Sequence, residues 1–325
     1  MHIFYLDSTD FFYKCRKSLV LDNKTANEYP YNEWQCAFWG KTMKTKLEKV
    51  KLNNGVKMPS LGIGTWQIPD SEDLVRSLES AIRLGYRYLD TAAIYENEGS
   101  VGEAIRRSGV KRSELFVSSK CWAANRTYDS VMRAFEESLR NLKLDYLDCY
   151  LIHWPFTKGD PLAWQSVNVG TWRAFEKLYE EGLVKVIGVS NFQMHHLVSF
   201  LARANVKPAV NQLEFHPGYT QKYTVAYCKK NGITVEAWSP LGHGSLLDEP
   251  LIKEVADRYN RSVAQVILRW CRHHDVIPVT RALTTLHQME NLESFDFDLS
   301  ADDIERLDRL PVMGFSGLEP DHVSF

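Results

Sequence analysis

Asp90-Thr91-Ala92-Ala93-Ile94-Tyr95-Glu96-Asn97-Glu98 is the most informative segment of this chain for predicting its fold and function. It follows the short apolar run 86–89 and places a carboxylate and a phenol five residues apart. Two later apolar runs also end in a polar side chain, Lys120 after 115–119 and His153 after 147–152. The carboxyl ends of parallel strands meet at one rim of a barrel. The sequence therefore predicts that Asp90, Tyr95, Lys120 and His153 lie together.

These four side chains form a set that can donate a proton. A phenol has a pKa near 10, so it is a weak acid at neutral pH unless a neighbouring cation stabilises the phenolate. We expect Lys120 to be that cation, Asp90 to hold it, and His153 to orient a substrate oxygen. Each residue alone has an ordinary structural explanation, such as a core histidine or a helix-capping aspartate. Their joint occurrence favours a site that protonates an oxygen while another group supplies the electrons.

Short apolar runs alternate with segments of helical spacing along most of the chain. The expected strands are 61–65, 86–89, 115–119, 147–153, 184–189, 209–213, 233–238 and 276–280. The expected helices include 71–84, 128–142, 171–181 and 262–272, the first opening with a serine cap and an acidic turn. Eight strands that alternate with helices imply parallel pairing through helical crossovers. We predict a closed (β/α)8 TIM barrel.

An open doubly wound sheet is the alternative architecture. A dinucleotide-binding sheet of that kind carries Gly-x-Gly-x-x-Gly after its first strand. Here Leu61-Gly62-Ile63-Gly64-Thr65-Trp66 supplies two glycines and no third, which argues against it. In front of the barrel, Asn53-Asn54-Gly55 separates two short runs, 47–52 and 56–58, and this pattern predicts an N-terminal β-hairpin.

Composition limits the classes of protein that fit. The chain has 325 residues, 44% of them hydrophobic, and a formal net charge of −2, so a nucleic-acid partner is not expected. The six cysteines form no CxxC pair, which favours reduced thiols and a cytoplasmic location. No apolar run reaches the roughly 20 residues that span a bilayer. Domain-like patterning starts near Thr45, so we expect residues 1–42 to be a disordered or non-native extension and 43–325 to form the domain.

A second group of polar residues follows the later strands. Ser190, Asn191 and Gln212 offer hydroxyl and amide groups, and Trp238 offers a flat aromatic face. Together they suit a nicotinamide, which is a planar ring bearing one amide. The alternative is that Asn191 and Gln212 serve only to satisfy backbone groups of the loops.

The chain resembles the aldo-keto reductases from about Thr45 to Phe325. The resemblance rests on Asp90–Glu98, on Leu151-Ile152-His153-Trp154-Pro155, and on Gly188-Val189-Ser190-Asn191-Phe192. It implies a catalytic tetrad of Asp90, Tyr95, Lys120 and His153, with Tyr95 as general acid in carbonyl reduction. It also implies substrate contacts at Trp66, Tyr95, Trp122, His153 and Trp154, and a C-terminal loop, Gly317–Phe325, over the site.

The resemblance further implies a nicotinamide dinucleotide bound in extended form without a Gly-rich loop. Its expected contacts are Thr65, Asp90, Ser190, Asn191, Gln212, Trp238, Ser239, Leu241, Thr280, Arg281, His287, Glu290 and Asn291. One departure affects the choice of cofactor. Where the family usually has Ile-Pro-Lys-Ser, then Arg, this chain has Ile277-Pro278-Val279-Thr280-Arg281 and then His287. Thr280 and Arg281 could rebuild a grip on the 2′-phosphate, since a guanidinium suits phosphate geometry. We favour NADPH and keep NADH as possible.

The leading hypothesis is an NAD(P)H-dependent reductase of aldehydes, with ketones, aldoses and dicarbonyls as further candidates. We expect a small-molecule carbonyl substrate, no metal, no membrane, and a monomer or weak homodimer. A second hypothesis is a nucleotide-sensing interaction subunit like the family's channel-associated members. A third is metal-dependent hydrolysis, for which His195-His196 and His273-His274 are the candidate ligands. Adjacent histidines on a helix should point apart and lie at the surface, which argues against a shared ion.

Overall fold

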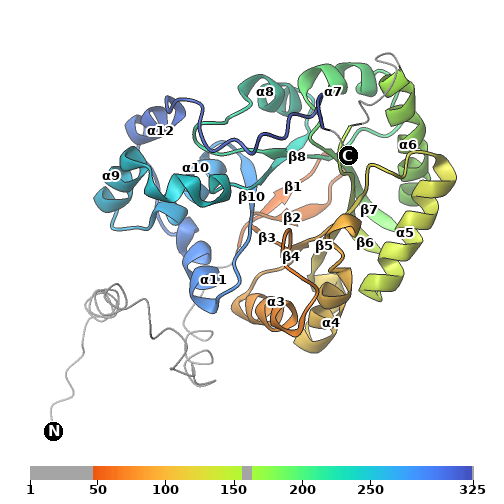
Figure 1. Cartoon of the computed structure of the whole chain (residues 1–325), viewed down its shortest axis with the longest axis horizontal. Helices are drawn as coiled ribbons and strands as arrows, with labels where there is room; N and C mark the ends of the chain where they lie inside the picture. The colour runs from red at the N-terminus through yellow and green to blue at the C-terminus, as the bar shows by residue number, and fades with distance from the viewer. Residues whose placement is uncertain (1–46, 156–162, 324–325) are drawn as a thin grey trace, which may run out of the picture. The chain divides into compact units, whose positions relative to one another are not determined.

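The computed structural model describes residues 47–155 and 163–323, all of which belong to the unit Thr45–Phe325. The prediction made for residues 1–42 lies outside the described residues, and the domain boundary stays a prediction. Among the described residues, no helix is long and apolar enough to cross a membrane. Figure 1 shows the strands gathered at the centre, with helices around them.

Eight parallel strands form a closed barrel in the order β10-β3-β4-β5-β6-β7-β8-β9, which confirms the predicted (β/α)8 fold. Each strand lies close to its predicted position because a strand buried on both faces appears in sequence as one apolar run. The strands are β3 (Gly62–Gly64), β4 (Tyr88–Asp90), β5 (Phe116–Cys121), β6 (Leu147–Ile152), β7 (Val184–Ser190), β8 (Val210–Glu214), β9 (Thr234–Trp238) and β10 (Val276–Thr280).

The helices cover the barrel and begin at recognisable caps. Ser71 caps α3 through its side chain, and Thr127 and Ser262 form capping boxes at α5 and α10. The helices are α3 (Glu72–Leu84), α4 (Glu98–Ser108), α5 (Tyr128–Leu142), α6 (Ala163–Glu180), α7 (Met194–Leu201), α8 (Lys222–Lys230), α9 (Pro250–Arg258), α10 (Val263–His273), α11 (Thr285–Leu292) and α12 (Ala301–Asp308).

The predicted start of α6 was wrong. The helix begins at Ala163, eight residues before the expected Thr171. Its first two turns carry polar side chains such as Gln165, Ser166 and Asn168, and these interrupt the apolar spacing from which a helix is recognised. Asn168 is nevertheless buried.

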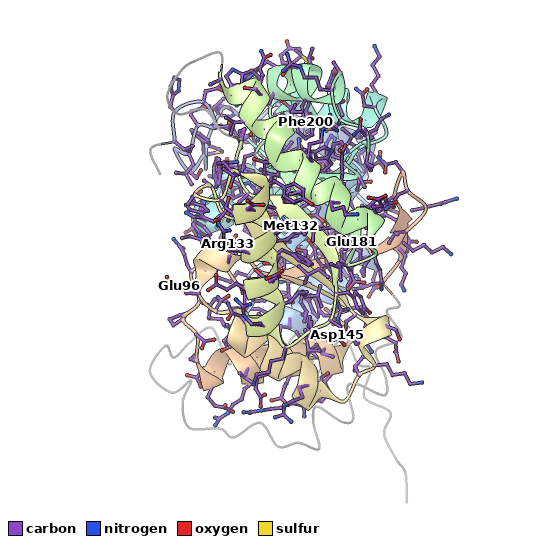
Figure 2. The ribbon with its side chains drawn as sticks, turned by 90° about the vertical axis from the view of Figure 1, so that its right-hand side faces the viewer. Glu96, Met132, Arg133, Asp145, Glu181 and Phe200 are labelled. Atoms are coloured by element: carbon purple, nitrogen blue, oxygen red, sulfur yellow. The ribbon has the colours of Figure 1, made fainter. Side chains whose placement is uncertain are left out.

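Figure 2 shows the side of the barrel that α5 and α6 cover, with Met132 and Arg133 labelled on α5.

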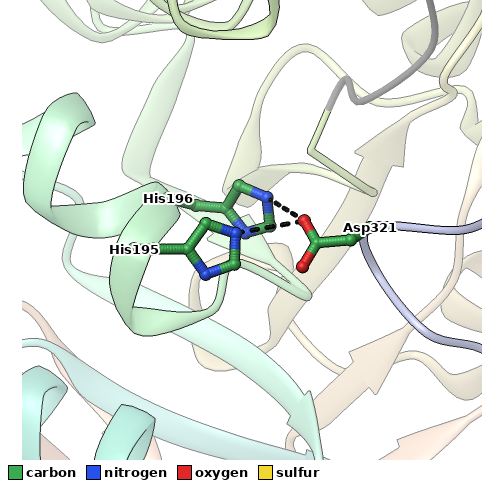
Figure 3. A group of neighbouring side chains, drawn as sticks. All are labelled: His195, His196 and Asp321. Carbon is green, nitrogen blue, oxygen red and sulfur yellow. Dashed lines mark hydrogen bonds and ion pairs between the residues drawn. The ribbon is translucent and has the colours of Figure 1, made fainter. Parts of the chain in front are cut away.

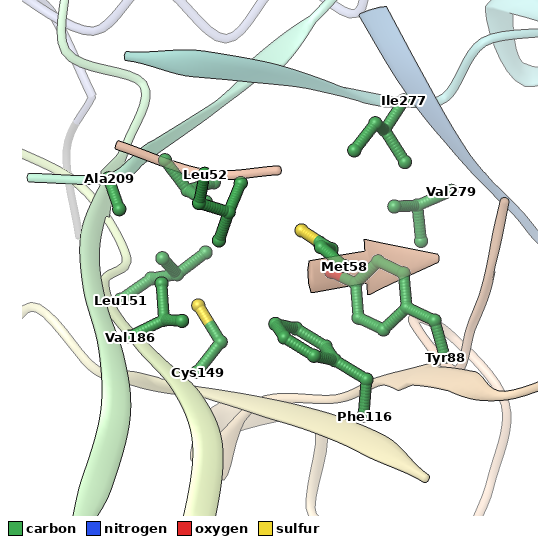
Figure 4. Close-up of a cluster of buried hydrophobic side chains, with 11 residues drawn as sticks. Leu52, Met58, Tyr88, Phe116, Cys149, Leu151, Val186, Ala209, Ile277 and Val279 are labelled. Carbon is green, nitrogen blue, oxygen red and sulfur yellow. The ribbon is translucent and has the colours of Figure 1, made fainter. Parts of the chain in front are cut away.

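The predicted hairpin is present and closes one end of the barrel. Strands β1 (Lys49–Lys51) and β2 (Lys57–Pro59) pair antiparallel. Leu52 and Met58 of this hairpin are buried in one cluster with side chains of the barrel strands, among them Tyr88, Phe116 and Ile277 (Figure 4). The barrel interior at this end is therefore a packed core, which leaves the opposite rim for a site.

The barrel wall allows no side chain at Gly188 of β7. A Cβ there would stand 2.7 Å from Leu151 Cδ2 and 2.7 Å from the backbone oxygen of Val210. We expect Gly188→Ala to lower the free energy of unfolding by about 1–3 kcal/mol, because a backbone oxygen cannot give way as a side chain can. Urea denaturation followed by circular dichroism measures the change.

Gly170 of α6 supplies the matched control, since a Cβ there meets nothing within 4 Å. Gly170→Ala should leave stability unchanged or raise it by up to about 1 kcal/mol, because alanine favours the helix. Equal midpoints for the two variants would contradict the close packing at Gly188.

Candidate active site

A cavity of about 930 Å³ opens at the carboxyl ends of the strands, and we call it the rim cavity. Its wall includes Tyr95, Trp238 and Arg281, together with Leu318 from the C-terminal segment. All site residues predicted from the sequence line it, with two exceptions, Thr65 and Lys120. The position of Leu318 agrees with the expected C-terminal loop over the site. Residues at the ends of different strands, far apart in the sequence, therefore lie together around this cavity, as the sequence predicted.

Asp90 and Lys120 form a buried ion pair beneath the cavity. The Nζ of Lys120 lies 2.6 Å from Asp90 Oδ2 and 2.9 Å from the backbone oxygen of Thr91. The same nitrogen lies 3.5 Å from the hydroxyl of Tyr95. Burial alone would lower the pKa of Lys120, but the neighbouring Asp90 and Tyr95 outweigh it and hold that pKa above its usual value. Lys120 is therefore an ammonium that points at the phenol.

The expected effect of Lys120 on the pKa of Tyr95 is present, but the effect of burial outweighs it. The Lys120 charge does favour the phenolate, but burial of the ring is the larger influence and raises the pKa of Tyr95 above 10. The Asp90 carboxylate acts in the same direction as burial. Because Lys120 is already paired with Asp90, its remaining attraction cannot compensate for desolvation. Tyr95 is thus a fully protonated phenol at neutral pH.

His153 faces Tyr95 across the cavity wall, with ring centroids 5.7 Å apart. Burial, and then the charges of Lys120 and Arg126, lower the pKa of His153 well below its usual value, so the imidazole is neutral. Its Nδ1 is buried and has no hydrogen-bond partner in the described parts of the chain. An unprotonated Nδ1 is the tautomer that leaves no N–H group buried without a partner. We infer that Nε2 carries the proton and can donate to a ligand.

Ser190, Asn191 and Trp238 already form hydrogen bonds with other groups of the protein. Asn191 donates to the backbone oxygen of His153 at 3.0 Å and accepts from Trp238 Nε1 at 2.8 Å. Ser190 donates its hydroxyl hydrogen to the backbone oxygen of Gln212 at 2.9 Å. Asn191 therefore does bind a backbone group of a loop, which is the alternative role considered for it in the sequence analysis. These same contacts also hold Asn191 and Trp238 rigidly at the cavity wall.

Four tryptophan side chains also line the cavity. Trp66 and Trp154 each approach Trp238 edge-on with centroids 6.4 Å apart, and Trp122 approaches His153 at 5.3 Å. Sequence reasoning missed His243, which contacts Trp66 at 5.4 Å. His243 stands between two glycines, and this is a sequence signal for a tight loop after a strand.

The segment after β10 lines another part of the rim cavity. Asn291 donates to Thr280 Oγ1 at 3.3 Å, and both residues are buried. Arg281 and His287 are exposed, and no residue in ranges 47–155 and 163–323 forms a hydrogen bond or ion pair with Arg281. Ser262, Val263 and Ala264 at the start of α10 also line the cavity and were not predicted. The capping serine was their sequence signal, because a helix N-terminus attracts phosphate.

Thr65 is not placed as the sequence analysis expected. It is fully buried, and its hydroxyl lies 3.2 Å from both the backbone oxygen of Asp90 and the Oδ1 of Asn97. Thr65 therefore joins strand ends beneath the cavity rather than lining it. The sequence around Thr65 does not indicate this buried position, because its partner Asn97 lies on another segment of the chain.

The prediction for His195 and His196 was wrong in two respects. Both Nε2 atoms lie 3.0 Å from Asp321 Oδ1, so the adjacent rings converge on one carboxylate (Figure 3). His196 is also fully buried rather than at the surface. The reason is that the C-terminal segment lies across the start of α7 and brings the Asp321 carboxylate to the Nε2 atoms of both rings. His195, His196 and Asp321 are the one group of three possible metal ligands in the described residues.

The tautomer of His196 argues against an ion at this group. Its Nδ1 accepts a hydrogen bond from the backbone N–H of Gln193 at 3.1 Å, so the ring proton belongs on Nε2. A metal ligand must offer a lone pair at that atom instead. The group is better explained as a tether for the C-terminal segment. Ser316 provides a second anchor, because its backbone N–H donates to Glu214 at 2.8 Å.

Comparisons with known proteins agree with this fold. The model of the Aldo/keto reductase family matches residues 60–311. A glyoxal reductase of Bacillus subtilis (strain 168) is 47% identical over 278 residues, covering 86% of this chain and 98% of its own length. A morphine 6-dehydrogenase of Pseudomonas putida is 41% identical over 294 residues, covering 86% and 97%.

A solved structure of a Bombyx mori aldo-keto reductase in complex with NADP superimposes with a TM-score of 0.75 and 33% identity, covering 81% of this chain and 92% of the other. The chain belongs to the aldo/keto reductase family. Carbonyl reduction with a nicotinamide cofactor is the chemistry that this membership supports.

Proposed function

We propose that this protein reduces aldehydes to alcohols with NADPH, and that Tyr95 is the general acid. The observation that carries the proposal is the position of Lys120 Nζ beneath the rim cavity, 2.6 Å from Asp90 Oδ2 and 3.5 Å from the hydroxyl of Tyr95, which itself lines the cavity. Ketones, aldoses and dicarbonyls are further substrate candidates. The name of the Bacillus subtilis relative, glyoxal reductase, makes dicarbonyls the first class to test.

The chain's own residues account for the proton and for the placement of the carbonyl. The Tyr95 hydroxyl donates a proton to the substrate oxygen as negative charge develops there, and Lys120 stabilises the resulting phenolate. His153 holds the same oxygen through Nε2–H. A bound reduced nicotinamide supplies the hydride. Trp66, Trp122 and Trp154 exclude water and accept apolar substituents of varied shape, which favours a broad substrate range.

The cavity residues also fit the cofactor. The Oε1 of Gln212 accepts no hydrogen bond from any residue in the described part of the chain, so it can accept one from a carboxamide. Trp238 is fixed by Asn191 and can flank a flat ring. The exposed guanidinium of Arg281, which pairs with no acidic group among the described residues, can bind a 2′-phosphate. These features support NADPH over NADH, and we propose that NADH is used less well.

We expect Arg281→Ala to weaken NADPH binding roughly tenfold and to leave NADH binding unchanged, because only NADPH carries the 2′-phosphate. The free energy that a charge-assisted hydrogen bond contributes at an exposed site is near the low end of the range for such bonds. Titration of tryptophan fluorescence with each cofactor gives both dissociation constants. Arg133→Ala on α5 is the control. If NADH binds wild-type protein as tightly as NADPH does, the proposed preference is wrong.

The overall proposal is tested by following the absorbance of NADPH with a panel of dicarbonyls, aromatic aldehydes, aldoses and ketones. Turnover of at least one class is the expected result. NADPH binding without turnover of any class would instead favour the nucleotide-sensing alternative. The same purified chain, run on a calibrated sizing column, tests our further proposal that it is a monomer or weak homodimer.

A further inference from the structure

One acidic side chain beneath the rim cavity takes no part in the proton transfer described above. Glu236 lies on β9 two residues before Trp238, so both side chains project into the barrel on the same face of the strand. Glu236 is fully buried. A buried carboxyl group is costly unless it is hydrogen-bonded or neutralised, so its contacts show what it does.

Glu236 and Asp90 share the side-chain amide of Gln212. The Nε2 of Gln212 donates to Glu236 Oε2 at 2.7 Å and to Asp90 Oδ1 at 3.1 Å. Both N–H groups of the amide are thereby used. In the opposite orientation the amide oxygen would instead face the Asp90 carboxylate, which is paired with Lys120, and the Oε2 atom of Glu236. Gln212 therefore presents Oε1, an acceptor, to the cavity, where a nicotinamide carboxamide would offer its NH2.

Glu236 is also connected to the Asp90–Lys120 pair. The Tyr88 hydroxyl lies 3.0 Å from Glu236 Oε1 and 3.4 Å from Asp90 Oδ1. Burial, and then the charge of Asp90, raise the pKa of Glu236 to about 8, against the opposing effects of Gln212, Tyr88 and Lys120. The titratable and polar groups that face it are Tyr88 and Asp90 on β4, Lys120 on β5, Cys149 on β6 and Gln212 on β8. The neighbour in register on β10 is the apolar Ile277.

We propose that Glu236 is a positioning residue: it fixes the orientation of Gln212 toward the cofactor carboxamide, and its charge state acts on Lys120 and Tyr95 through Asp90. The proposal rests on the proposed function. Below about pH 8 Glu236 is neutral and the Asp90–Lys120 pair is balanced. Above that pH a second carboxylate faces the pair. Tyr95 then becomes a weaker acid, so reduction should slow as pH rises through this value.

The first test measures cofactor binding alone. Tryptophan fluorescence gives the Kd of NADP+ and of its acetyl analogue, in which a methyl group replaces the carboxamide NH2. Wild-type protein should bind NADP+ about two- to tenfold more tightly than the acetyl analogue, so the ratio of the two Kd values reports one ordinary hydrogen bond. Glu236→Ala should reduce this ratio toward one, because Gln212 can then turn over. Glu236→Gln keeps an acceptor for Gln212 and should retain the ratio.

The second test measures kcat for aldehyde reduction against pH. Wild-type protein should show a severalfold decline centred near pH 8, where Glu236 ionises. Glu236→Gln cannot ionise and should lose this decline. Tyr88→Phe removes a hydrogen bond that lowers the pKa of Glu236, so its decline should move to higher pH. A purely structural role for Glu236 would change stability without moving either the ratio or the profile.

The outcomes separate the two proposals. Wild-type protein that neither binds NADPH nor turns over any carbonyl overturns both. Wild-type protein that does both, with an unchanged amide-to-acetyl ratio in Glu236→Ala and an unchanged decline in Glu236→Gln, overturns the role of Glu236 alone.

Discussion

Replacing Tyr95 with phenylalanine is expected to lower kcat/KM for aldehyde reduction by about 10²–10⁴-fold, the usual contribution of a positioned general acid. The ring keeps its place between Lys120 and His153, so only the hydroxyl is lost. The Kd of NADPH should stay at the wild-type value, since the proposed cofactor contacts lie on other residues. Stopped-flow turnover and fluorescence titration measure the two quantities separately.

The pH dependence gives an independent check on the same residue. Burial raises the pKa of Tyr95, so the phenol remains protonated below that value and stays available as a donor throughout the neutral range. Alcohol oxidation needs the phenolate instead, so its kcat/KM should increase as pH rises toward the pKa of Tyr95. Tyr95→Phe should abolish this increase. If oxidation by the phenylalanine variant still rises with pH, another group is the base.

Much of the fold could be predicted because its physical causes are local. Several barrel strands are short apolar runs, and Ser71, Thr127 and Ser262 indicate where helices begin by their capping chemistry. Helices such as α7 and α8 were not predicted, since each has only eight or nine residues and a short apolar stripe. That Asp90, Lys120 and His153 lie near one another could be predicted as well, because a polar side chain that ends an apolar strand is conspicuous.

What sequence could not supply was the balance between effects that depend on burial. Lys120 does attract the Tyr95 phenolate, yet the sign of the net shift in pKa was decided by desolvation, which only coordinates reveal. Glu236 passed unnoticed inside a strand because its partners, Gln212 and Tyr88, lie on other strands. His196 and Asp321 likewise meet only when the chain has folded.

Lys120→Met is expected to abolish reduction and to lower the free energy of unfolding by about 3–5 kcal/mol. Lys120 is fully buried, and methionine matches its length without its charge. The change leaves Asp90 as a buried carboxylate without its cation, and an unpaired buried charge is far more costly than the loss of a surface pair. Urea denaturation measures stability, and the steady-state rate measures reduction.

A double variant separates charge from packing. Asp90→Asn combined with Lys120→Met removes both charges, and asparagine can still accept the hydrogen bonds from Ser118 and Gln212 at the Oδ1 position. Replacing a whole buried pair by neutral groups of similar volume is often close to neutral for stability. The double variant should therefore regain most of the lost stability and none of the activity. Recovery of activity would show that the ammonium does not assist Tyr95, and failure to regain stability would show that Lys120 contributes mainly through packing.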